Sequence, residues 1–374
     1  MRKILIIGLI LRLAVMVFTL HGDLFFIWGG PVKFVTDSVL SKKNYPPLSF
    51  LTFALLSPLY LLGEKIGWWV LRLPYLFFDL AIVKLLFKLL PKDKHQPALV
   101  LWWLNPAVLF VTYAQGQIEI IVAAFLLLSV VLVKRSKNLA LLAYSTAVAY
   151  KTIPVFFLPA AAAYLGNNWR QRAKLLFIGI SVPVILGLIF WKLPGFDVIS
   201  SYFPKASRPQ LACGLRPDAA WKCVTGSIGL LGYVVVLLMG LYRKEKVHEF
   251  MYAKILFSAA AFYAIGSSVT VIHRYIMLMP LFVLWAVKKK WPAKLVWGWL
   301  ILIFLGLNYT WPLQEGLIKY WYPQAINKLA LREAVAPLVN YEHIALAARM
   351  IADVILVRFI LSLWLTHPVK KLHS

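Results

Sequence analysis

The sequence predicts an all-α fold, a polytopic membrane protein with about ten full transmembrane helices plus re-entrant or short helical segments. Three observations carry this prediction. Hydrophobic residues make up 61% of the 374 residues, more than a soluble domain can bury. Apolar stretches of roughly 20 residues recur along the chain. Forty Lys and Arg stand against fourteen Asp and Glu, and the basic runs lie beside the apolar stretches. Cytoplasmic loops have this pattern, so we expect no nucleic-acid partner.

The first apolar stretch follows the basic start MRK, as in a secretory signal. Arg12 interrupts its core and no small-residue cleavage site follows, so we expect an uncleaved first span over 4–20. The remaining spans are predicted by length and composition. They cover 67–90, 98–113, 117–133, 175–191, 224–242, 250–268, 275–287, 294–310 and 344–365.

Two apolar stretches, 48–63 and 139–165, fit a single crossing poorly. If the basic runs MRK and KRSK are both cytoplasmic, an even number of crossings separates them, so 48–63 is expected to dip in or to lie at the surface. Likewise, the basic runs KRSK and NNWRQRAK (167–174) can both be cytoplasmic only if 139–165 is a short hairpin bent at Pro154, with Lys151 near its tip. This topology puts the segments 21–47, 113–119, 192–223, 267–274 and 311–343 on the non-cytoplasmic side. The compact chain and basic loops fit a prokaryotic plasma membrane.

No solenoid repeat or low-complexity tract is visible, which favours one integral-membrane domain over residues 1–374. Three of the outer segments are long: 21–47, 192–223 and 311–343. Long loops that share one face often build a functional site.

Asp23 directly follows the first span and precedes the aromatic residues Phe25, Phe26 and Trp28. Such rings collect at the level of the lipid headgroups. A carboxylate held among them can accept a proton from a hydroxyl nucleophile. The alternative is a solvated loop acid that ends the helix.

The motif YPPL, at 45–48, marks the point where the chain turns back toward the membrane. Two consecutive prolines fix the φ angles, and they push Tyr45 into an extended conformation. The motif is at least a rigid corner.

Further motifs follow in a set order: LRLPYLFFDL (71–80), WWLNPAVLFVTYAQGQIE (102–119), AYKTIPVFFLP (149–159) and HRY (273–275). With the acid after the first span and YPPL, they resemble the GT-C superfamily of polytopic glycosyltransferases. The similarity is to the GPI mannosyltransferase catalytic subunit and to dolichyl-phosphate-glucose glucosyltransferases, and it covers roughly residues 1–165. It implies a GT-C-like catalytic module over 1–174 with the outer loop 21–47. Variable C-terminal helices would then occupy 175–374, with outer loops 192–223 and 311–343.

The resemblance implies transfer of a hexose, mannose or glucose, from a polyprenyl-phosphate donor to a glycan, glycolipid or protein on the non-cytoplasmic face. The catalytic role falls on Asp23. The GPI mannosyltransferases carry an Asp-x-Asp in this loop, whereas this chain has Phe25 at the second position. A divalent metal is therefore not supported, no cofactor is expected, and an inverting displacement with an Asp base is favoured.

Other polar residues on the predicted outer side are candidates for binding. Lys151 is a candidate for the donor phosphate, although its side chain could instead extend to water. His273 and Arg274 could form a second phosphate clamp or could anchor a helix at the headgroups. Arg208 lies in the basic loop 192–223, whose natural partners are anionic headgroups.

The turn between two short spans carries Gln115, Gln117 and Glu119, which could bind sugar or acceptor hydroxyls or could cap the helix ends. Tyr45 is a further candidate for sugar or acceptor binding. The two cysteines, Cys213 and Cys223, could form a disulfide in an oxidising compartment, and the sequence leaves this open.

Arg12 lies in the middle of the first predicted span, and Arg72 and Asp79 share another, seven residues apart. A charge at mid-bilayer costs on the order of 3 kcal/mol, so it is normally paired or lines a polar cavity. The favoured interpretation is a structural pair of Arg12 and Asp79 that holds two spans together.

Two other functions remain open. A transporter or lipid-linked sugar flippase also places charges and broken helices in the membrane, but it predicts inverted repeats, and no matching halves are visible. A non-catalytic subunit that binds lipid-linked sugars is the third possibility. Membrane lipids are expected partners in each case, and the sequence leaves the acceptor and the oligomeric state open.

Overall fold

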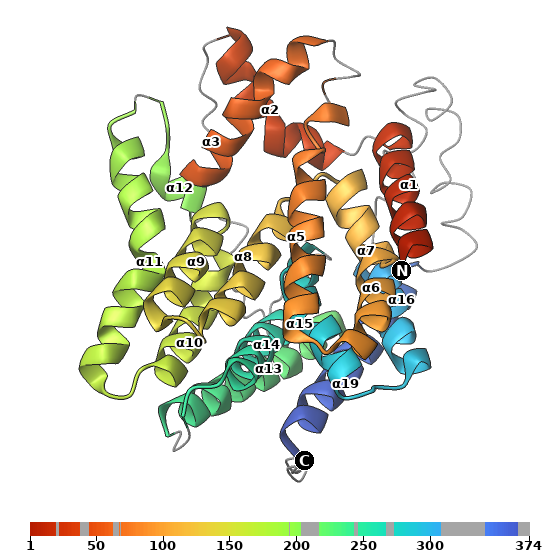
Figure 1. Cartoon of the computed structure of the whole chain (residues 1–374), viewed down its shortest axis with the longest axis vertical. Coiled ribbons are helices and arrows are strands. Elements are labelled where there is room, and N and C mark those ends of the chain that lie inside the picture. Colours follow the sequence, from red (N-terminus) through yellow and green to blue (C-terminus); the bar gives the residue numbers. More distant parts are fainter. Residues whose placement is uncertain are drawn as a thin grey trace.

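Every described element of the computed structural model is a helix, which confirms the all-α prediction for this part of the chain (Figure 1). The structure describes residues 1–19, 22–37, 45–62, 67, 69–193, 195–202, 217–242, 246–266, 273–307 and 341–365. Within these ranges the side chains at several helix ends fall outside the description, among them those of Asp23, His273 and Arg274.

The N-terminal half contains many short elements. They are α1 (Arg2–Phe18), α2 (Gly22–Asp37), α3 (Pro47–Leu56), η1 (Ser57–Leu62), α5 (Pro74–Leu89), η2 (Lys92–Lys94), α6 (His95–Trp103), α7 (Pro106–Val108), η3 (Leu109–Ala114), α8 (Glu119–Leu132), α9 (Lys137–Tyr150), η4 (Ile153–Phe157) and α10 (Leu158–Leu165).

The C-terminal half contains longer helices. They are α11 (Trp169–Trp191), α12 (Val198–Tyr202), α13 (Pro217–Leu241), α14 (Glu249–Gly266), α15 (His273–Lys288), α16 (Ala293–Leu307) and α19 (Tyr341–Leu365). Each predicted span of both halves contains helix, although the span predicted over 98–113 is divided among α6, α7 and η3.

Among the described helices, two are long and apolar enough to cross a membrane, α11 and residues 223–241 of α13. Helix α11 has 23 residues, so it rises about 35 Å, enough for the roughly 30 Å hydrocarbon core of a bilayer. Trp169 and Trp191 lie at its ends, 75% and 64% exposed, and between them Phe177 is 72% exposed. Apolar rings exposed along such a helix, with tryptophans at both ends, indicate a membrane protein.

A third apolar segment is bent by 44° between Lys92–Trp103 and Pro106–Ala114. The break follows from Asn105 and Pro106, because proline has no N–H to continue the ladder of α6. The Asn105 side-chain oxygen accepts the backbone N–H of Ala107 at 2.9 Å and of Val108 at 3.4 Å, which starts α7.

The segment 21–47 is not the loop that the sequence analysis predicts, because α2 occupies residues 22–37. Most of this stretch is apolar and it keeps helical geometry through Pro31. The corner after it agrees with the prediction: Pro46 precedes α3 with φ −49° and ψ 150°, and Pro47 is its first residue.

Helix α9 ends before Lys151, which is extended with φ −154° and ψ 131°. The chain then folds back, and the Tyr144 hydroxyl donates to the Pro154 carbonyl at 2.5 Å. These contacts confirm the predicted break, with Lys151 at the bend. The stretch 48–63 is likewise divided into α3 and η1.

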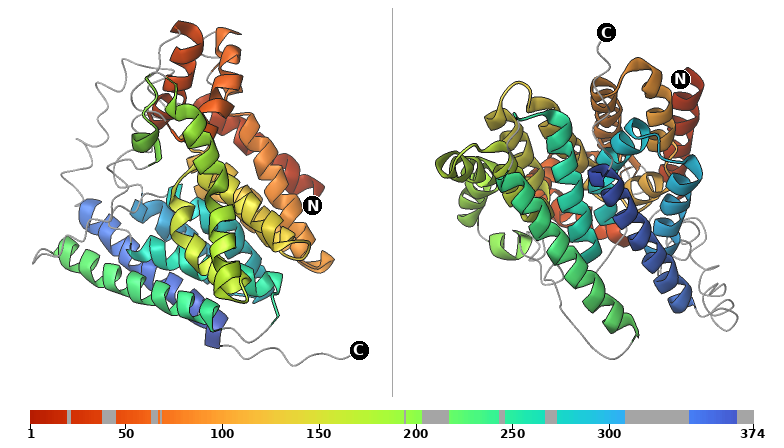
Figure 2. Two further views of the ribbon diagram at one scale, coloured as in Figure 1. Left: turned by 90° about the vertical axis from the view of Figure 1, so that its left-hand side faces the viewer. Right: turned by 90° about the horizontal axis from the view of Figure 1, so that it is seen from below.

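Helices α13 and α14 lie side by side (Figure 2). A Cβ added at Gly229 would lie 2.5 Å from the Cα of Gly266, so glycine permits this close approach. Small residues allow the same approach between membrane helices.

One end of the molecule collects α2, α3 and α12 (Figure 1). Rings join these elements to the end of α11: the Phe50 ring lies 5.5 Å from that of Phe34, 6.2 Å from Phe190 and 5.3 Å from Phe196. Elsewhere, Lys134 contacts Glu249 at 2.7 Å and so joins the turn after α8 to the start of α14. Helix α2 lies within the segment 21–47 that was predicted on the outer side, and α3 follows it directly.

Candidate functional site

Arg72 lies in the turn before α5, fully buried, and holds the end of α1. Its guanidinium donates to the carbonyls of Thr19 at 3.0 Å and Tyr113 at 2.5 Å, and also to that of Met16. The last carbonyls of a helix lack partners within the helix, and a cation near them is favourable. Arg72 thus joins the end of α1, just before α2, to the end of η3.

The turn that contains Gln115 and Gln117 lies against the first turn of α2. Gly116 has φ +68°, and a Cβ added there would lie 2.2 Å from a methyl carbon of Leu24. The Tyr75 hydroxyl donates to the Gly116 carbonyl at 2.6 Å. The backbone of this turn is therefore fixed next to the residue that follows Asp23.

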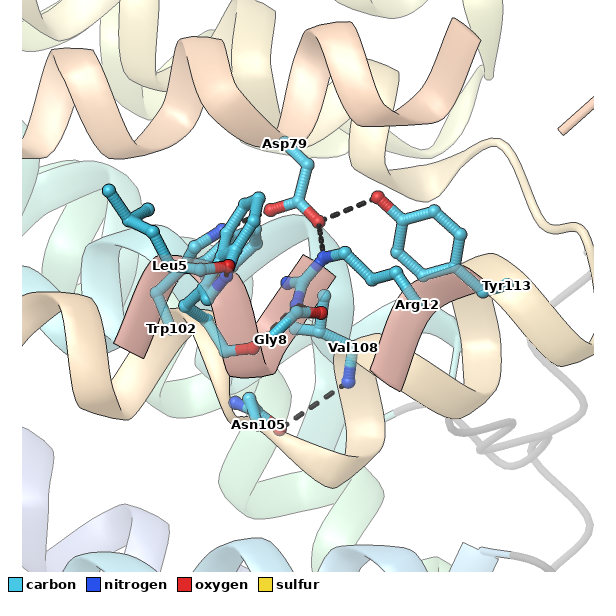
Figure 3. A network of polar contacts seen from close by, with 9 residues as sticks. Leu5, Gly8, Arg12, Asp79, Trp102, Asn105, Val108 and Tyr113 are labelled. Atoms are coloured by element: carbon cyan, nitrogen blue, oxygen red, sulfur yellow. Dashed lines mark hydrogen bonds and ion pairs between the residues drawn. The ribbon is translucent and has the colours of Figure 1, made fainter. Parts of the chain in front are cut away.

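Asp79 on α5 is the centre of a buried polar network (Figure 3). Its carboxylate accepts Arg12 Nε at 2.6 Å, Trp102 Nε1 at 2.5 Å and the Tyr113 hydroxyl at 2.7 Å. Both charged side chains are 0% exposed. The predicted pair of Arg12 and Asp79 is confirmed, and it links α1, α5, α6 and η3.

The Arg12 guanidinium also contacts the break after α6. It donates to the carbonyls of Gly8 at 3.0 Å and Trp103 at 2.6 Å, and it lies 3.7 Å from the centre of the Trp103 ring. A Cβ added at Gly8 would lie 1.9 Å from this ring. Glycine at position 8 therefore admits the indole that covers the cation.

Glu119 and Lys151 form a second ion pair, between Oε1 and Nζ. Glu119 begins α8 with its side chain 0% exposed, whereas the Lys151 side chain is 15% exposed. The Lys151 ammonium also lies 5.9 Å from the centre of the Tyr45 ring. The fold thus brings together three residues that the sequence analysis selected separately, and it places Lys151 against an acid rather than in water.

Side chains of α3 fix this arrangement. The Ser49 hydroxyl donates to the Tyr150 carbonyl at 2.7 Å, and Thr52 Oγ1 lies 2.9 Å from the Tyr150 hydroxyl. Thr152 then donates to the Tyr202 carbonyl at 2.5 Å. The ends of α3, α9 and α12 therefore surround the Lys151 bend.

Gln115, Gln117 and Glu119 are buried, with 6%, 3% and 0% exposure. The Gln115 side-chain oxygen has no hydrogen-bond partner among the described atoms. A buried amide oxygen in this state costs free energy unless a water or a ligand meets it. The side chains of the predicted polar turn are therefore buried rather than exposed. Among them, the carboxylate of Glu119 pairs with Lys151.

Several selected residues are described only in part or lie outside the described residues. Asp23 is in the first turn of α2, and His273 and Arg274 begin α15. Arg208 and Cys213 lie outside the described ranges. Cys223 in α13 is disulfide-bonded, and the chain has two cysteines.

The sequence analysis missed a polar contact between α15 and α19. The Tyr275 hydroxyl donates to Asp353 Oδ1 at 3.2 Å, and Arg349 Nε lies 3.7 Å from Asp353 Oδ2. The sequence does contain a signal for this pair: Asp353 is an acid in an apolar stretch, and Arg349 lies four residues before it.

In the described part of the chain, no three His, Cys, Asp or Glu side chains gather where they could hold a metal ion. The fold and its apolar helices define the class of the molecule, a helical membrane protein. No protein-family model matches the sequence, and no curated protein matches it.

Proposed function

We propose that this protein is a GT-C-type membrane glycosyltransferase with about ten spans. It transfers a hexose, mannose or glucose, from a polyprenyl-phosphate donor to a glycan, glycolipid or protein on the non-cytoplasmic face. The observation that most supports this proposal is that polar residues far apart in the sequence come together in the structure. Lys151, Glu119 and Tyr45 meet at one bend, and the 115–118 turn packs on Leu24, next to Asp23.

In the proposed reaction, Asp23 takes the proton of an acceptor hydroxyl. The resulting oxygen attacks the anomeric carbon in line, and the bond from that carbon to the phosphate oxygen breaks. Polyprenyl phosphate leaves with the electron pair of that bond, and the proton remains on Asp23. A single displacement of this kind inverts the anomeric configuration.

Lys151 is the proposed cation for the donor phosphate. An ammonium group has three N–H donors, so the contact with Glu119 leaves donors for a phosphate oxygen. Glu119 fixes the direction of the side chain before the donor arrives, which favours charge stabilisation without rearrangement. His273, Arg274 and Arg208 are proposed to supply further positive charge. Tyr45 and the turn of Gln115, Gln117 and Glu119 are proposed to face the sugar and the acceptor.

The test uses purified protein in lipid nanodiscs, labelled polyprenyl-phosphate mannose or glucose, and membranes of the expression host as the source of acceptors. Asp23→Asn is expected to lower the transfer rate by about 10²- to 10⁴-fold, the usual contribution of a general base. The matched control is Asp93→Asn in η2, whose side chain is 69% exposed. It should retain the full rate.

Unchanged transfer by Asp23→Asn would contradict the proposed role of this residue. A different assay separates the transporter alternative. In sealed vesicles, movement of the intact labelled donor between leaflets without loss of its sugar would support a flippase and overturn the proposal.

A further inference from the structure

Three buried polar residues project from the start of α5 toward other elements. Arg72, Tyr75 and Asp79 are separated by three and four residues, the spacing that places side chains on one side of a helical turn. All three are 0% exposed. Asp79 holds Arg12 of α1, whereas Arg72 and Tyr75 contact the backbone next to the candidate site.

The contacts of Arg72 fix both chain segments that lead into this site. The Thr19 carbonyl is four residues before Asp23, and the Tyr113 carbonyl is two residues before Gln115. A planar guanidinium with five N–H donors can hold several carbonyls at once in fixed directions. A lysine ammonium at the same place acts as a point charge and lacks this geometry.

Tyr75 fixes the position where the two segments touch. Its hydroxyl donates to the carbonyl of Gly116, the residue whose missing side chain leaves space for Leu24. With the Gly116 carbonyl held from one side and Leu24 packed on the other, α2 can approach the turn only in this register.

We propose that Arg72 and Tyr75 are positioning residues, which hold the Asp23 end of α2 against the 115–118 turn and touch no substrate. The role of this arrangement in catalysis rests on the proposed function. The packing of α2 against the turn does not depend on that function, so the packing and the catalysis can be tested separately.

The test measures the position directly through a cysteine pair, Leu24→Cys with Gly116→Cys. A Cβ at position 116 lies 3.6 Å from the Leu24 Cβ, inside the range of about 3.5 to 4.5 Å found in disulfides. The rate of crosslinking by a mild oxidant is read as a mobility shift after proteolysis between the two positions. The two single-cysteine variants show the background from the native cysteines.

Gly116→Cys places a side chain at φ +68°, a backbone conformation that has a cost for every residue with a Cβ, but every variant compared carries the same cysteine pair and therefore the same cost. With Arg72 and Tyr75 present, the pair is expected to crosslink. Arg72→Lys is expected to slow crosslinking about tenfold or more, because one ammonium group lacks the planar geometry that holds the three carbonyls in fixed directions. Tyr75→Phe removes one hydroxyl only and is expected to slow it several-fold. The matched control is Tyr144→Phe, which removes a buried hydroxyl bonded to the Pro154 carbonyl and should leave the crosslinking rate unchanged.

Transfer kinetics give the second measurement, made on the same Arg72 and Tyr75 variants without the added cysteines. The transfer rate at saturating donor should fall more than the apparent donor affinity, since neither residue touches donor. Slower crosslinking in Tyr75→Phe alone would be sufficient support if Arg72→Lys did not fold. An unchanged crosslinking rate in folded Arg72→Lys and Tyr75→Phe would overturn the positioning role, whatever the transfer rate. If crosslinking slowed while the unaltered chain transferred no sugar, the positioning role would stand and the proposed function would fail.

Discussion

Two ion pairs in the described part of the chain, Arg12 with Asp79 and Lys151 with Glu119, differ in how far they are separated from water. In the pair of Arg12 and Asp79 both side chains are 0% exposed, and Asp79 also accepts hydrogen bonds from Trp102 and Tyr113. In the pair of Glu119 and Lys151 the acid is equally buried, but the lysine is 15% exposed. The first pair is enclosed by protein groups on every side. The second contains one side chain, that of Lys151, which is partly exposed to solvent.

The comparison teaches that buried charges in this chain have two kinds of environment. A fully enclosed carboxylate with three donors joins four elements, and removal of either ion leaves the other without compensation. A lysine with a path to the surface can change its partner, since its long side chain can turn toward water or toward an anion. Burial of the acid is the same in both pairs, and the exposure of the cation is what distinguishes them.

The largest effect is expected for Asp79→Asn, which leaves the Arg12 guanidinium buried without a counter-charge. We expect a loss of about 3 to 5 kcal/mol in the free energy of unfolding, the usual result of breaking a buried pair. Thermal unfolding of the protein in detergent measures it, with Asp93→Asn as the exposed control. A double variant, Arg12→Met with Asp79→Leu, should recover part of the loss, and an unaltered midpoint in Asp79→Asn would contradict this account.

A smaller and asymmetric effect is expected at the second pair. Lys151→Met leaves Glu119 with no path to water, so we expect a loss of about 2 kcal/mol. Glu119→Gln leaves Lys151 able to reach solvent, so the loss should be about 1 kcal/mol or less. Unfolding midpoints of both variants in the same detergent test this order. Equal losses, or a larger loss for Glu119→Gln, would show that the exposure of Lys151 does not distinguish the two pairs.

The smallest effect concerns the pair of Lys134 and Glu249 outside the spans, where the lysine side chain is 65% exposed. Burial tends to raise the pKa of Glu249, but the hydrogen bond from Lys134 and the nearby His248 outweigh it and hold the pKa below its ordinary value. An acid with a lowered pKa in the folded state stabilises the fold above its unfolded pKa, and this contribution is lost as the pH falls through the folded value.

We therefore expect Glu249→Gln to remove a pH-dependent contribution of less than about 1 kcal/mol that the unaltered protein loses in acid. Unfolding midpoints between pH 3 and pH 7, an interval around the unfolded pKa of about 4.3, measure it. High salt should reduce the difference, because the exposed lysine is screened. A difference that grows toward low pH would have the wrong sign.

The sequence alone predicted that the chain is helical and which charges inside its apolar stretches need a partner. Each apolar stretch predicted as a span contains helix, and Arg12 and Asp79 were paired correctly because an isolated charge in hydrocarbon is costly. The YPPL corner and the break at Lys151 followed from the fixed φ angle of proline. The corner and the break depend on residues close in the sequence. The pair of Arg12 and Asp79 follows from the rule that a charge inside a span needs an opposite charge, which leaves few possible partners.

Only the tertiary structure decided which segments meet. The helix at 22–37 was predicted as part of an outer loop after the first span, whereas packing of Leu24 on Gly116 and of Phe34 on Phe50 favours a helix. The contact between Glu119 and Lys151 joins positions 32 residues apart, and Arg72 reaches three carbonyls on two other segments. Local periodicity carries no information on such contacts. They depend on the path of the chain through space. The same path decides whether a buried acid is paired with a fully buried cation, as Asp79 is, or with a partly exposed one, as Glu119 is.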